Sequence, residues 1–167
     1  MKNRYLIATV LASIIVALDQ LTKVLVLSRF RLGESVTVIE NFFNLTFVKN
    51  YGAAFGFLSQ SHPEFREIFF LTMPPVAMIV IGTLLKKAPA DDKMQIYALS
   101  SILGGALGNY IDRLRFRYVV DFLDFHWFNK YSWPAFNIAD SAIVIGVGVL
   151  MYQMYLEGKK QKANQST

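Results

Sequence analysis

The segment FNIADSAIVIGVGVLMYQMYL, from Phe136 to Leu156, decides the fold class of this chain. It is long enough and apolar enough to cross a bilayer as a helix, which takes about 20 residues. Asp140 lies one turn inside its start. A carboxylate in hydrocarbon costs on the order of 2.5–3.5 kcal/mol on insertion scales, and such a residue is a functional candidate by default. The segment therefore predicts a membrane protein with a polar site at the start of this helix.

Three other stretches approach spanning length, and the sequence predicts an all-α membrane bundle of four transmembrane helices. The expected spans cover residues 5–27, 68–85, 94–112 and 136–156. The two outer loops cover residues 29–66 and 113–135. Lys2 and Arg4 precede the first span, but no small-residue cleavage site follows it, so we expect a retained helix rather than a signal peptide. We expect residues 1–167 to form a single integral membrane domain.

The composition of the chain supports this class. Hydrophobic residues make up 54% of it and charged residues 17%, where a soluble domain has about 25%. The chain has no cysteine, which excludes disulfides, thiolate catalysis and cysteine zinc sites. The net charge of +5 comes from basic residues that flank the apolar runs, which favours anionic headgroups over nucleic acid as the partner. With two histidines, His62 and His126, we expect no metal site and no cofactor.

Four spans place both termini on one side of the membrane. Basic residues on that side fall in short tails and one tight loop, so the positive-inside rule predicts cytoplasmic termini. All the unusual polar residues then lie near the outer face, and they would share one face even if the orientation were reversed. They are Asp19, Lys23, Asn50, Asn109, Asp112, Arg113, Asp121, Asn137, Asp140 and Ser141.

The two outer loops have different patterns. Ser35–Ile39 and Asn44–Val48 are rich in β-branched and aromatic residues, which predicts a small antiparallel sheet outside the cytoplasm. Gly52 and Gly56 then indicate a turn or a close backbone approach. For 113–135 we expect a short loop or helix, with Trp127 and other aromatic residues at the membrane interface.

Two clusters on the expected helices allow more than one interpretation. Asp19 and Lys23 are one turn apart, so they form either a self-neutralising pair or the lining of a polar site. Asn109, Asp112 and Arg113 share a helix face beside the small-residue motif of Gly104 and Gly108, which permits close packing. The simplest interpretation of this second cluster is a structural network at the interface.

Asp121 and Asp140 are the best candidates for chemistry. Asp121 is set among apolar residues, which predicts a raised pKa, whereas Asp124 is interpreted as a surface residue. Two carboxylates held close together share one proton, and one can then take a proton from water while the other protonates a carbonyl oxygen. The two residues are 19 positions apart in the sequence, so no single helix face carries both, and the loop before Phe136 must bring them together.

Two other classes of function remain open from the residues alone. A proton-coupled transporter would use Asp19, Asp112 and Asp140 as a relay, although the cytoplasmic halves of the spans are mostly apolar. A membrane scaffold without catalytic activity would not depend on Asp121 or Asp140.

Five motifs in this chain resemble those of the lipoprotein signal peptidases (signal peptidase II). In order, they are ALDQLTK at 17–23, VKNYGAAFGF at 48–57, GGALGNYIDR at 104–113, VVDF at 119–122 and FNIADS at 136–141. The resemblance spans nearly the whole chain. It implies an aspartic endopeptidase of the bacterial inner membrane that cuts prolipoproteins just before a diacylglyceryl-modified cysteine, with its site at the outer face. The implied partners are prolipoproteins, membrane lipids and the inhibitor globomycin, and we expect a monomer.

The same resemblance assigns roles to residues. It implies Asp121 and Asp140 as the catalytic pair. Supporting or substrate-binding roles follow for Asp19, Lys23, Asn50, Gly52, Gly108, Asn109, Asp112, Arg113, Asn137 and Ala139. The first outer loop corresponds to the β-cradle of the family, and the second to a mobile segment over the site.

Overall fold

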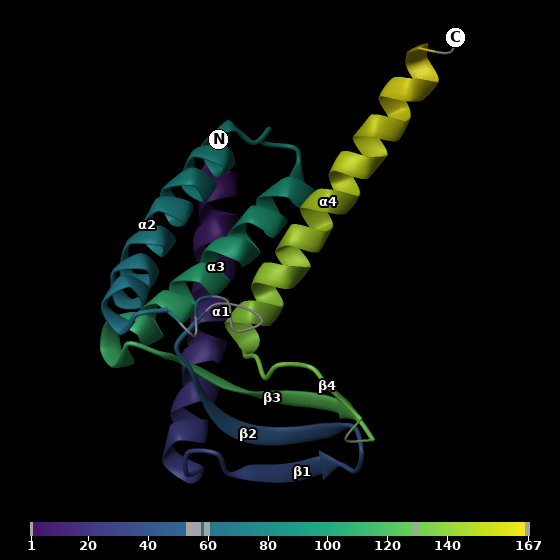
Figure 1. Cartoon of the computed structure of the whole chain (residues 1–167). Helices are drawn as coiled ribbons and strands as arrows, with labels where there is room; N and C mark the ends of the chain where they lie inside the picture. The colour runs from purple at the N-terminus through teal and green to yellow at the C-terminus, as the bar shows by residue number, and fades with distance from the viewer. Residues whose placement is uncertain (1, 53–57, 59–60, 129, 166–167) are drawn as a thin grey trace.

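The computed structural model describes residues 2–52, 58, 61–128 and 130–165. Four helices and a small sheet make up this part of the chain (Figure 1). The helices are α1 (Lys2–Arg29), α2 (Pro63–Lys87), α3 (Lys93–Phe116) and α4 (Ile138–Gln165). The strands are β1 (Ser35–Ile39), β2 (Phe43–Asn50), β3 (Val119–Trp127) and β4 (Tyr131–Ser132). Both termini lie at the end of the bundle opposite the sheet (Figure 1).

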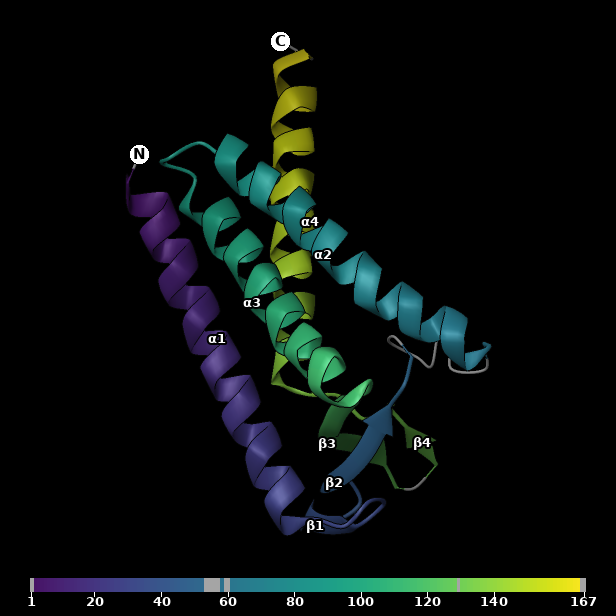
Figure 2. The ribbon, with the colours of Figure 1, turned by 90° about the vertical axis from the view of Figure 1, so that its left-hand side faces the viewer.

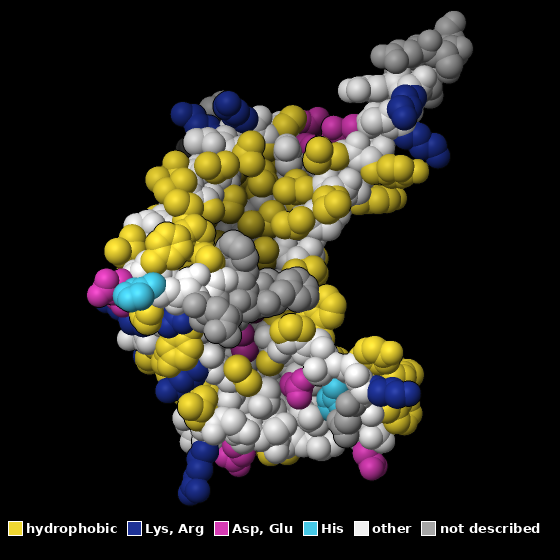
Figure 3. Space-filling view, in the orientation of Figure 1, with side chains coloured by type: hydrophobic (Ala, Val, Ile, Leu, Met, Phe, Trp, Pro, Cys, Tyr) yellow, Lys and Arg dark blue, Asp and Glu magenta, His cyan; other side chains and the backbone are white. Residues whose placement is uncertain are grey.

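The helices expected from the sequence are all present, and α2 continues through Pro74 and Pro75. Three of them, α1, α2 and α4, are long and apolar enough to cross a membrane by length and composition. Figure 3 shows hydrophobic side chains over the helical part and basic side chains gathered towards its ends. Within the described residues α3 does not meet this standard, so four spans are not confirmed.

The low hydropathy of α3 has a structural reason. This helix packs against each of α1, α2 and α4, so much of its surface faces protein. Its buried positions include several small or polar residues, namely Ser100, Gly104, Gly105, Gly108, Asn109 and Asp112. A helix that faces other helices does not need a lipid-compatible surface on every side.

The sheet is antiparallel, with the strand order β1-β2-β3-β4. The two strands predicted in the first outer loop are confirmed as β1 and β2. The expectation of a loop or helix after α3 is wrong for the described residues, which form β3 and β4. The segment Val119–Trp127 is rich in valine and aromatic residues, which favour strands, and β3 covers the edge of β2. The turn predicted at Gly56 lies outside the described residues.

An apolar cluster fastens the sheet to the bundle. Val26 of α1 packs with Phe47 of β2 and with Val120 and Phe122 of β3, and all four side chains are buried. Figures 1 and 2 accordingly place the sheet beside the end of α1. The sheet therefore has a fixed position relative to the helix ends.

The chain that leads into α4 returns to β3. Phe136 and Leu123 exchange backbone hydrogen bonds, with N···O distances of 3.1 and 2.8 Å, and form an isolated antiparallel bridge. The rings of Phe136 and Phe125 stack with centroids 5.7 Å apart. Because α4 begins two residues later, this pairing sets the start of α4 beside the middle of β3.

Close glycine contacts hold α3 against α1 and α4. A Cβ atom on Gly104 would lie 3.0 Å from the Cα of Ala12, and one on Gly108 would lie 2.6 Å from Oδ2 of Asp19. A Cβ atom on Gly105 would clash with the carbonyl oxygen of Ala139. The close packing predicted from Gly104 and Gly108 is confirmed.

Gly108→Ala is expected to lower the stability of the protein by about 1–3 kcal/mol, the usual range for overpacking. The added methyl group must displace the Asp19 carboxylate, which is buried and cannot move into solvent. Thermal unfolding in detergent measures the effect. Gly148→Ala is the matched control, because nothing lies within 4 Å of its Cβ position and α4 is helical there. Equal unfolding temperatures for the two variants would contradict the packing argument.

Candidate active site

Asp121 lies on β3 with its side chain 1% exposed. Its two carboxylate oxygens accept hydrogen bonds from different amides. Asn50 Nδ2 donates to Oδ2 at 2.9 Å, and Asn137 Nδ2 donates to Oδ1 at 2.7 Å. Because one donor comes from the end of β2 and the other from the residue before α4, three segments fix the orientation of this carboxylate.

Asp140 lies in the first turn of α4 and is half-buried. Asn109 Nδ2 donates to its Oδ1 at 2.7 Å. The backbone N–H of Asn137 donates to its Oδ2 at 3.2 Å, and the N–H of Asp140 donates to Asn137 Oδ1 at 2.9 Å. This reciprocal pair is a capping box, which satisfies backbone donors at the helix start.

Asn137 thus contacts both carboxylates, through its side chain on Asp121 and its backbone on Asp140. It is fully buried and also donates to Asn109 Oδ1 at 3.1 Å. The expectation that the loop before α4 brings Asp121 and Asp140 to one site agrees with this geometry. Asp140 is half-buried and Asp121 is buried, so the two carboxylates of the site differ in exposure.

Lys23 is the centre of a buried charge network beside the aspartates. Its Nζ lies 2.9 Å from Asp19 Oδ2, 3.0 Å from Asp112 Oδ2 and 3.0 Å from Asn109 Oδ1. Its side chain is 2% exposed, and those of Asp19 and Asp112 are 0% and 1% exposed. Buried charges of this kind persist only when paired and hydrogen-bonded.

The two carboxylates paired with Lys23 each hold the backbone of a neighbouring segment. Asp19 Oδ1 accepts the N–H of Ala139 at 3.0 Å, and Asp112 Oδ2 accepts the N–H of Val120 at 3.0 Å. Ala139 precedes Asp140 and Val120 precedes Asp121 in the sequence. The network therefore fixes the backbone immediately before each aspartate of the pair.

This arrangement answers the alternatives left open by the sequence. Asp19 and Lys23 do pair, and the pair is buried beside the two aspartates. Asp112 belongs to the buried network rather than to the interface. A relay through Asp19 and Asp112 is not favoured, because both carboxylates are already engaged by Lys23 and by backbone donors.

The remaining predicted positions lie around this centre. Arg113 Nη2 donates to the Gly52 carbonyl at 3.1 Å, and the Gly52 N–H donates to Asn50 Oδ1 at 2.9 Å. Gly108 leaves room for the Asp19 carboxylate. Asp124, interpreted as a surface residue, is half-buried on the sheet and accepts from Asn44 at 3.3 Å, which is outside the site.

The sequence analysis missed Gln20. Its Nε2 donates to Asp112 Oδ1 at 2.9 Å and to the Gly108 carbonyl at 3.1 Å. A polar residue inside an apolar span, next to Asp19, was the signal available for it. Val120 was also missed, because its contribution is its backbone, which donates to Asp112 and accepts from Asn137.

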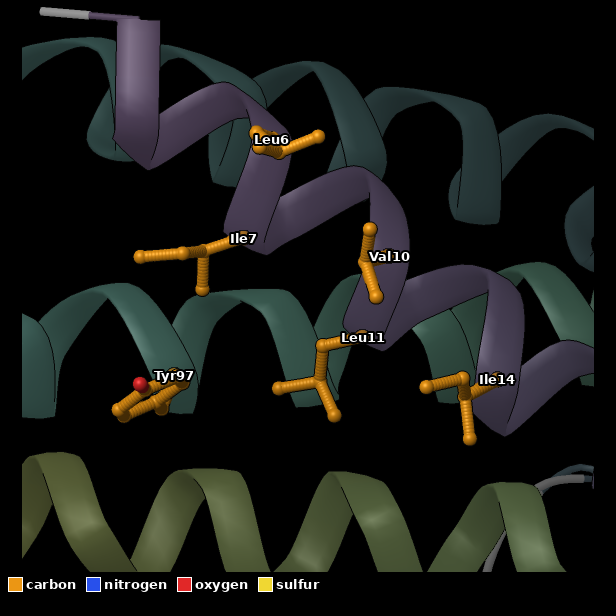
Figure 4. A pocket seen from close by; sticks show the side chains of 6 residues that line it. All are labelled: Leu6, Ile7, Val10, Leu11, Ile14 and Tyr97. Carbon is orange, nitrogen blue, oxygen red and sulfur yellow. The ribbon is translucent and has the colours of Figure 1, made fainter.

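A cavity among the described residues lies away from the aspartates and has a different character. It is a groove of about 330 Å³ along α1 and α3, towards the end of the bundle that carries the termini (Figure 4). Hydrophobic side chains line it, namely Leu6, Ile7, Val10, Leu11, Ile14 and Tyr97. Among its described lining residues there is no carboxylate or histidine, so the pair of aspartates remains the candidate site.

Comparison with known proteins decides the family. A family model described as signal peptidase (SPase) II matches residues 11–156. The chain belongs to the signal peptidase II family. Lipoprotein signal peptidases from Syntrophotalea carbinolica and Haemophilus ducreyi are 44% and 42% identical to it, over 96% and 90% of this chain and 98% and 92% of theirs. The chain is therefore a peptidase, and its apolar helices make it a multi-pass membrane protein.

Two solved structures share the fold of this chain. A bacterial membrane enzyme determined by the in meso method at 2.3 Å resolution superposes with a TM-score of 0.83 at 33% identity, covering 92% of this chain and 90% of that one. A second, at 1.9 Å resolution, gives a TM-score of 0.78 at 31% identity, covering 88% and 91%. The arrangement of helices and sheet is thus shared with these two bacterial membrane enzymes.

Proposed function

We propose that this protein removes signal peptides from diacylglyceryl-modified prolipoproteins and cuts the bond just before the lipidated cysteine. The observation that carries the proposal is the pair Asp121 and Asp140, bridged by Asn137 at the end of the membrane helices. A substrate that is part peptide and part lipid has its scissile bond at the membrane surface. Asp140 at the start of α4, with Asp121 beside it on β3, supports a reaction at that depth.

The proposed mechanism is direct attack by water. One ionised carboxylate of the pair takes a proton from the water while the other, which holds the shared proton, protonates the scissile carbonyl oxygen. The tetrahedral intermediate then collapses, its C–N bond breaks, and the departing amine receives a proton from the pair. Asn50, Asn109 and Asn137 hold the carboxylates in position through the hydrogen bonds described above.

We further propose that α3 is the fourth span, that both termini are cytoplasmic and that the site faces outwards. The contacts of α3 with all three apolar helices support its place in the bilayer. Since the chain has no cysteine, single cysteines report the orientation cleanly. In intact cells, Ser35→Cys on β1 should react with a membrane-impermeant maleimide, and Lys160→Cys on α4 should react only after permeabilisation. The opposite pattern would reverse the proposed orientation.

Cleavage of a purified prolipoprotein tests the substrate assignment. The wild-type enzyme should cut the diacylglyceryl-modified precursor and leave the unmodified precursor intact, with mass spectrometry locating the new amino terminus at the cysteine. Globomycin should inhibit the reaction, and size-exclusion chromatography with light scattering should give the mass of a monomer. Equal cleavage of both precursors would contradict the lipid requirement.

The pH dependence of cleavage should reflect Asp121. Burial, and then the nearby charge of Asp140, raise the pKa of Asp121 to about 7, while hydrogen bonds from Asn50 and Asn137 and the charge of Lys23 act in the opposite direction. The shared proton is therefore retained up to near-neutral pH. We expect kcat/KM to fall as the pH rises through about 7, because the general acid is lost.

Asn50→Ala gives this prediction a second readout. Asn50 donates to the carboxylate of Asp121 and stabilises its ionised form, so its removal should move the alkaline limb of the profile to higher pH. A limb that moves to lower pH, or a wild-type profile that stays level well above pH 7, would contradict the assignment of Asp121.

A further inference from the structure

Gln20 lies between the buried charge network and the backbone of α3. It follows Asp19 on α1, and its side chain is half-buried. Its Nε2 donates to Asp112 Oδ1 at 2.9 Å, to the Gly108 carbonyl at 3.1 Å and to Asp19 Oδ2 at 3.3 Å. One amide group thus contacts both carboxylates that pair with Lys23, and it also joins α1 to α3.

The hydrogen bonds around the two carboxylates show why a donor matters at this position. Lys23 contacts Oδ2 of Asp19 and Oδ2 of Asp112. The N–H of Val120 also binds Oδ2 of Asp112. Among the described residues, the hydrogen bond to Asp112 Oδ1 comes from Gln20. A buried carboxylate oxygen without a donor is unfavourable, so we expect Asp112 to change its orientation when this hydrogen bond is removed.

A path of hydrogen bonds leads from Gln20 to the aspartate pair. Asp112 Oδ2 accepts the N–H of Val120 at 3.0 Å, and the Val120 carbonyl accepts from Asn137 Nδ2 at 3.3 Å. The same nitrogen donates to Asp121 Oδ1 at 2.7 Å. A change in the orientation of the Asp112 carboxylate therefore alters the backbone next to Asp121 and the amide that holds its side chain.

We propose that Gln20 is a positioning residue for peptide cleavage, which fixes the Asp112 carboxylate and, through Val120, the orientation of Asp121. The three acceptors of its amide lie outside the aspartate pair, so it acts through other residues. The inference rests on the proposed role of Asp121 in cleavage. Because Gln20 acts as a donor, the effect of a substitution depends on whether donors remain at position 20.

Three substitutions of Gln20 separate hydrogen-bond donation from shape. Gln20→Met keeps the length of the side chain but removes the donor, so kcat for cleavage should fall about 10- to 100-fold with KM unchanged, the scale of a small misplacement of a catalytic group. Gln20→Glu keeps the shape but turns an oxygen towards three acceptors, so kcat should fall further. Gln20→Lys supplies new donors and should retain most of the activity.

Thr22→Val is the matched control for these variants. Thr22 lies on the same turn of α1 and is half-buried, but its hydroxyl donates to the carbonyls of Leu18 and Asp19 within the helix. This variant should keep the wild-type kcat. All rates are compared on monodisperse enzyme, at a temperature below the unfolding of every variant, so that a loss of folded protein does not enter kcat.

Hydrogen–deuterium exchange measures the proposed connection without cleavage. In Gln20→Met the amide of Val120 should exchange faster than in the wild type, because Asp112 no longer holds it in one position. The amide of Ala88, which donates to the Leu84 carbonyl at the end of α2, should exchange at the wild-type rate and is the internal reference. This measurement does not depend on the catalytic role of Asp121, so failure of that role and failure of the Gln20 proposal are distinguishable.

Four results would overturn the proposal. The first is wild-type kcat in Gln20→Met, and the second is an equal fall in kcat for Thr22→Val. The third is unchanged exchange of the Val120 amide in Gln20→Met. The fourth is an equal loss of activity in all three variants of Gln20, which would give its side chain a space-filling role.

Discussion

Replacing either Asp121 or Asp140 by asparagine is expected to lower kcat for prolipoprotein cleavage by at least about 10³-fold, within the range of general acid–base catalysis. Asparagine keeps the size of the side chain and much of its hydrogen bonding but cannot exchange a proton with water. Because the two carboxylates work as one unit, the double variant should be little worse than either single one. Single-turnover cleavage of the diacylglyceryl-modified precursor measures the effect.

Asp124→Asn provides the matched control for these variants. Asp124 lies on the same strand as Asp121 and is half-buried, but its contact is with Asn44 and not with the pair. It should retain wild-type activity. Full activity of Asp121→Asn or Asp140→Asn, or an equal loss in Asp124→Asn, would remove the assignment of the pair.

Lys23→Met is expected to have the largest effect on stability, about 3–5 kcal/mol, the cost of breaking a buried ion pair by removing one partner. It leaves Asp19 and Asp112 as adjacent buried carboxylates without their shared cation. The variant should unfold at a much lower temperature in detergent or fail to accumulate. Lys159→Met, an exposed lysine of α4, should be close to the wild type.

A triple variant separates charge from positioning. Adding Asp19→Asn and Asp112→Asn to Lys23→Met removes the uncompensated charges, so much of the stability should return. Activity should stay low, since amide side chains hold the N–H groups of Ala139 and Val120 less firmly than carboxylates do. A Lys23→Met variant as stable as the Lys159→Met control would contradict the network.

The sequence predicted the helices and the first two strands because their signals are local. Apolar runs of spanning length, and the β-branched and aromatic residues of Ser35–Ile39 and Asn44–Val48, are properties of neighbouring residues alone. The strand β3 was not predicted because polar and aromatic residues lie within and around Val119–Trp127. Such residues are as typical of a loop at the membrane interface as of a strand. What makes it a strand is pairing with β2, some 70 residues earlier in the chain.

The sequence predicted the members of the candidate site but not the connections between them. The motifs placed Asp19, Lys23 and Asp112 near the aspartates, yet only the fold shows that Lys23 joins the other two and that each holds a specific backbone amide. Gln20 was overlooked because a glutamine in a span carries no titratable group. The bridge through Asn137 depends on the pairing of Phe136 with Leu123, a tertiary contact that no local pattern encodes.

The most direct test of the central claim is a single turnover of cleavage in water enriched in oxygen-18. If the aspartates activate water for direct attack, every released signal peptide carries one oxygen-18 atom in its new terminal carboxylate. When the enzyme is then digested, its own fragments that contain Asp121 and Asp140 carry no oxygen-18. Oxygen-16 product in that first turnover, or oxygen-18 in either aspartate, would show a covalent acyl intermediate and contradict the account.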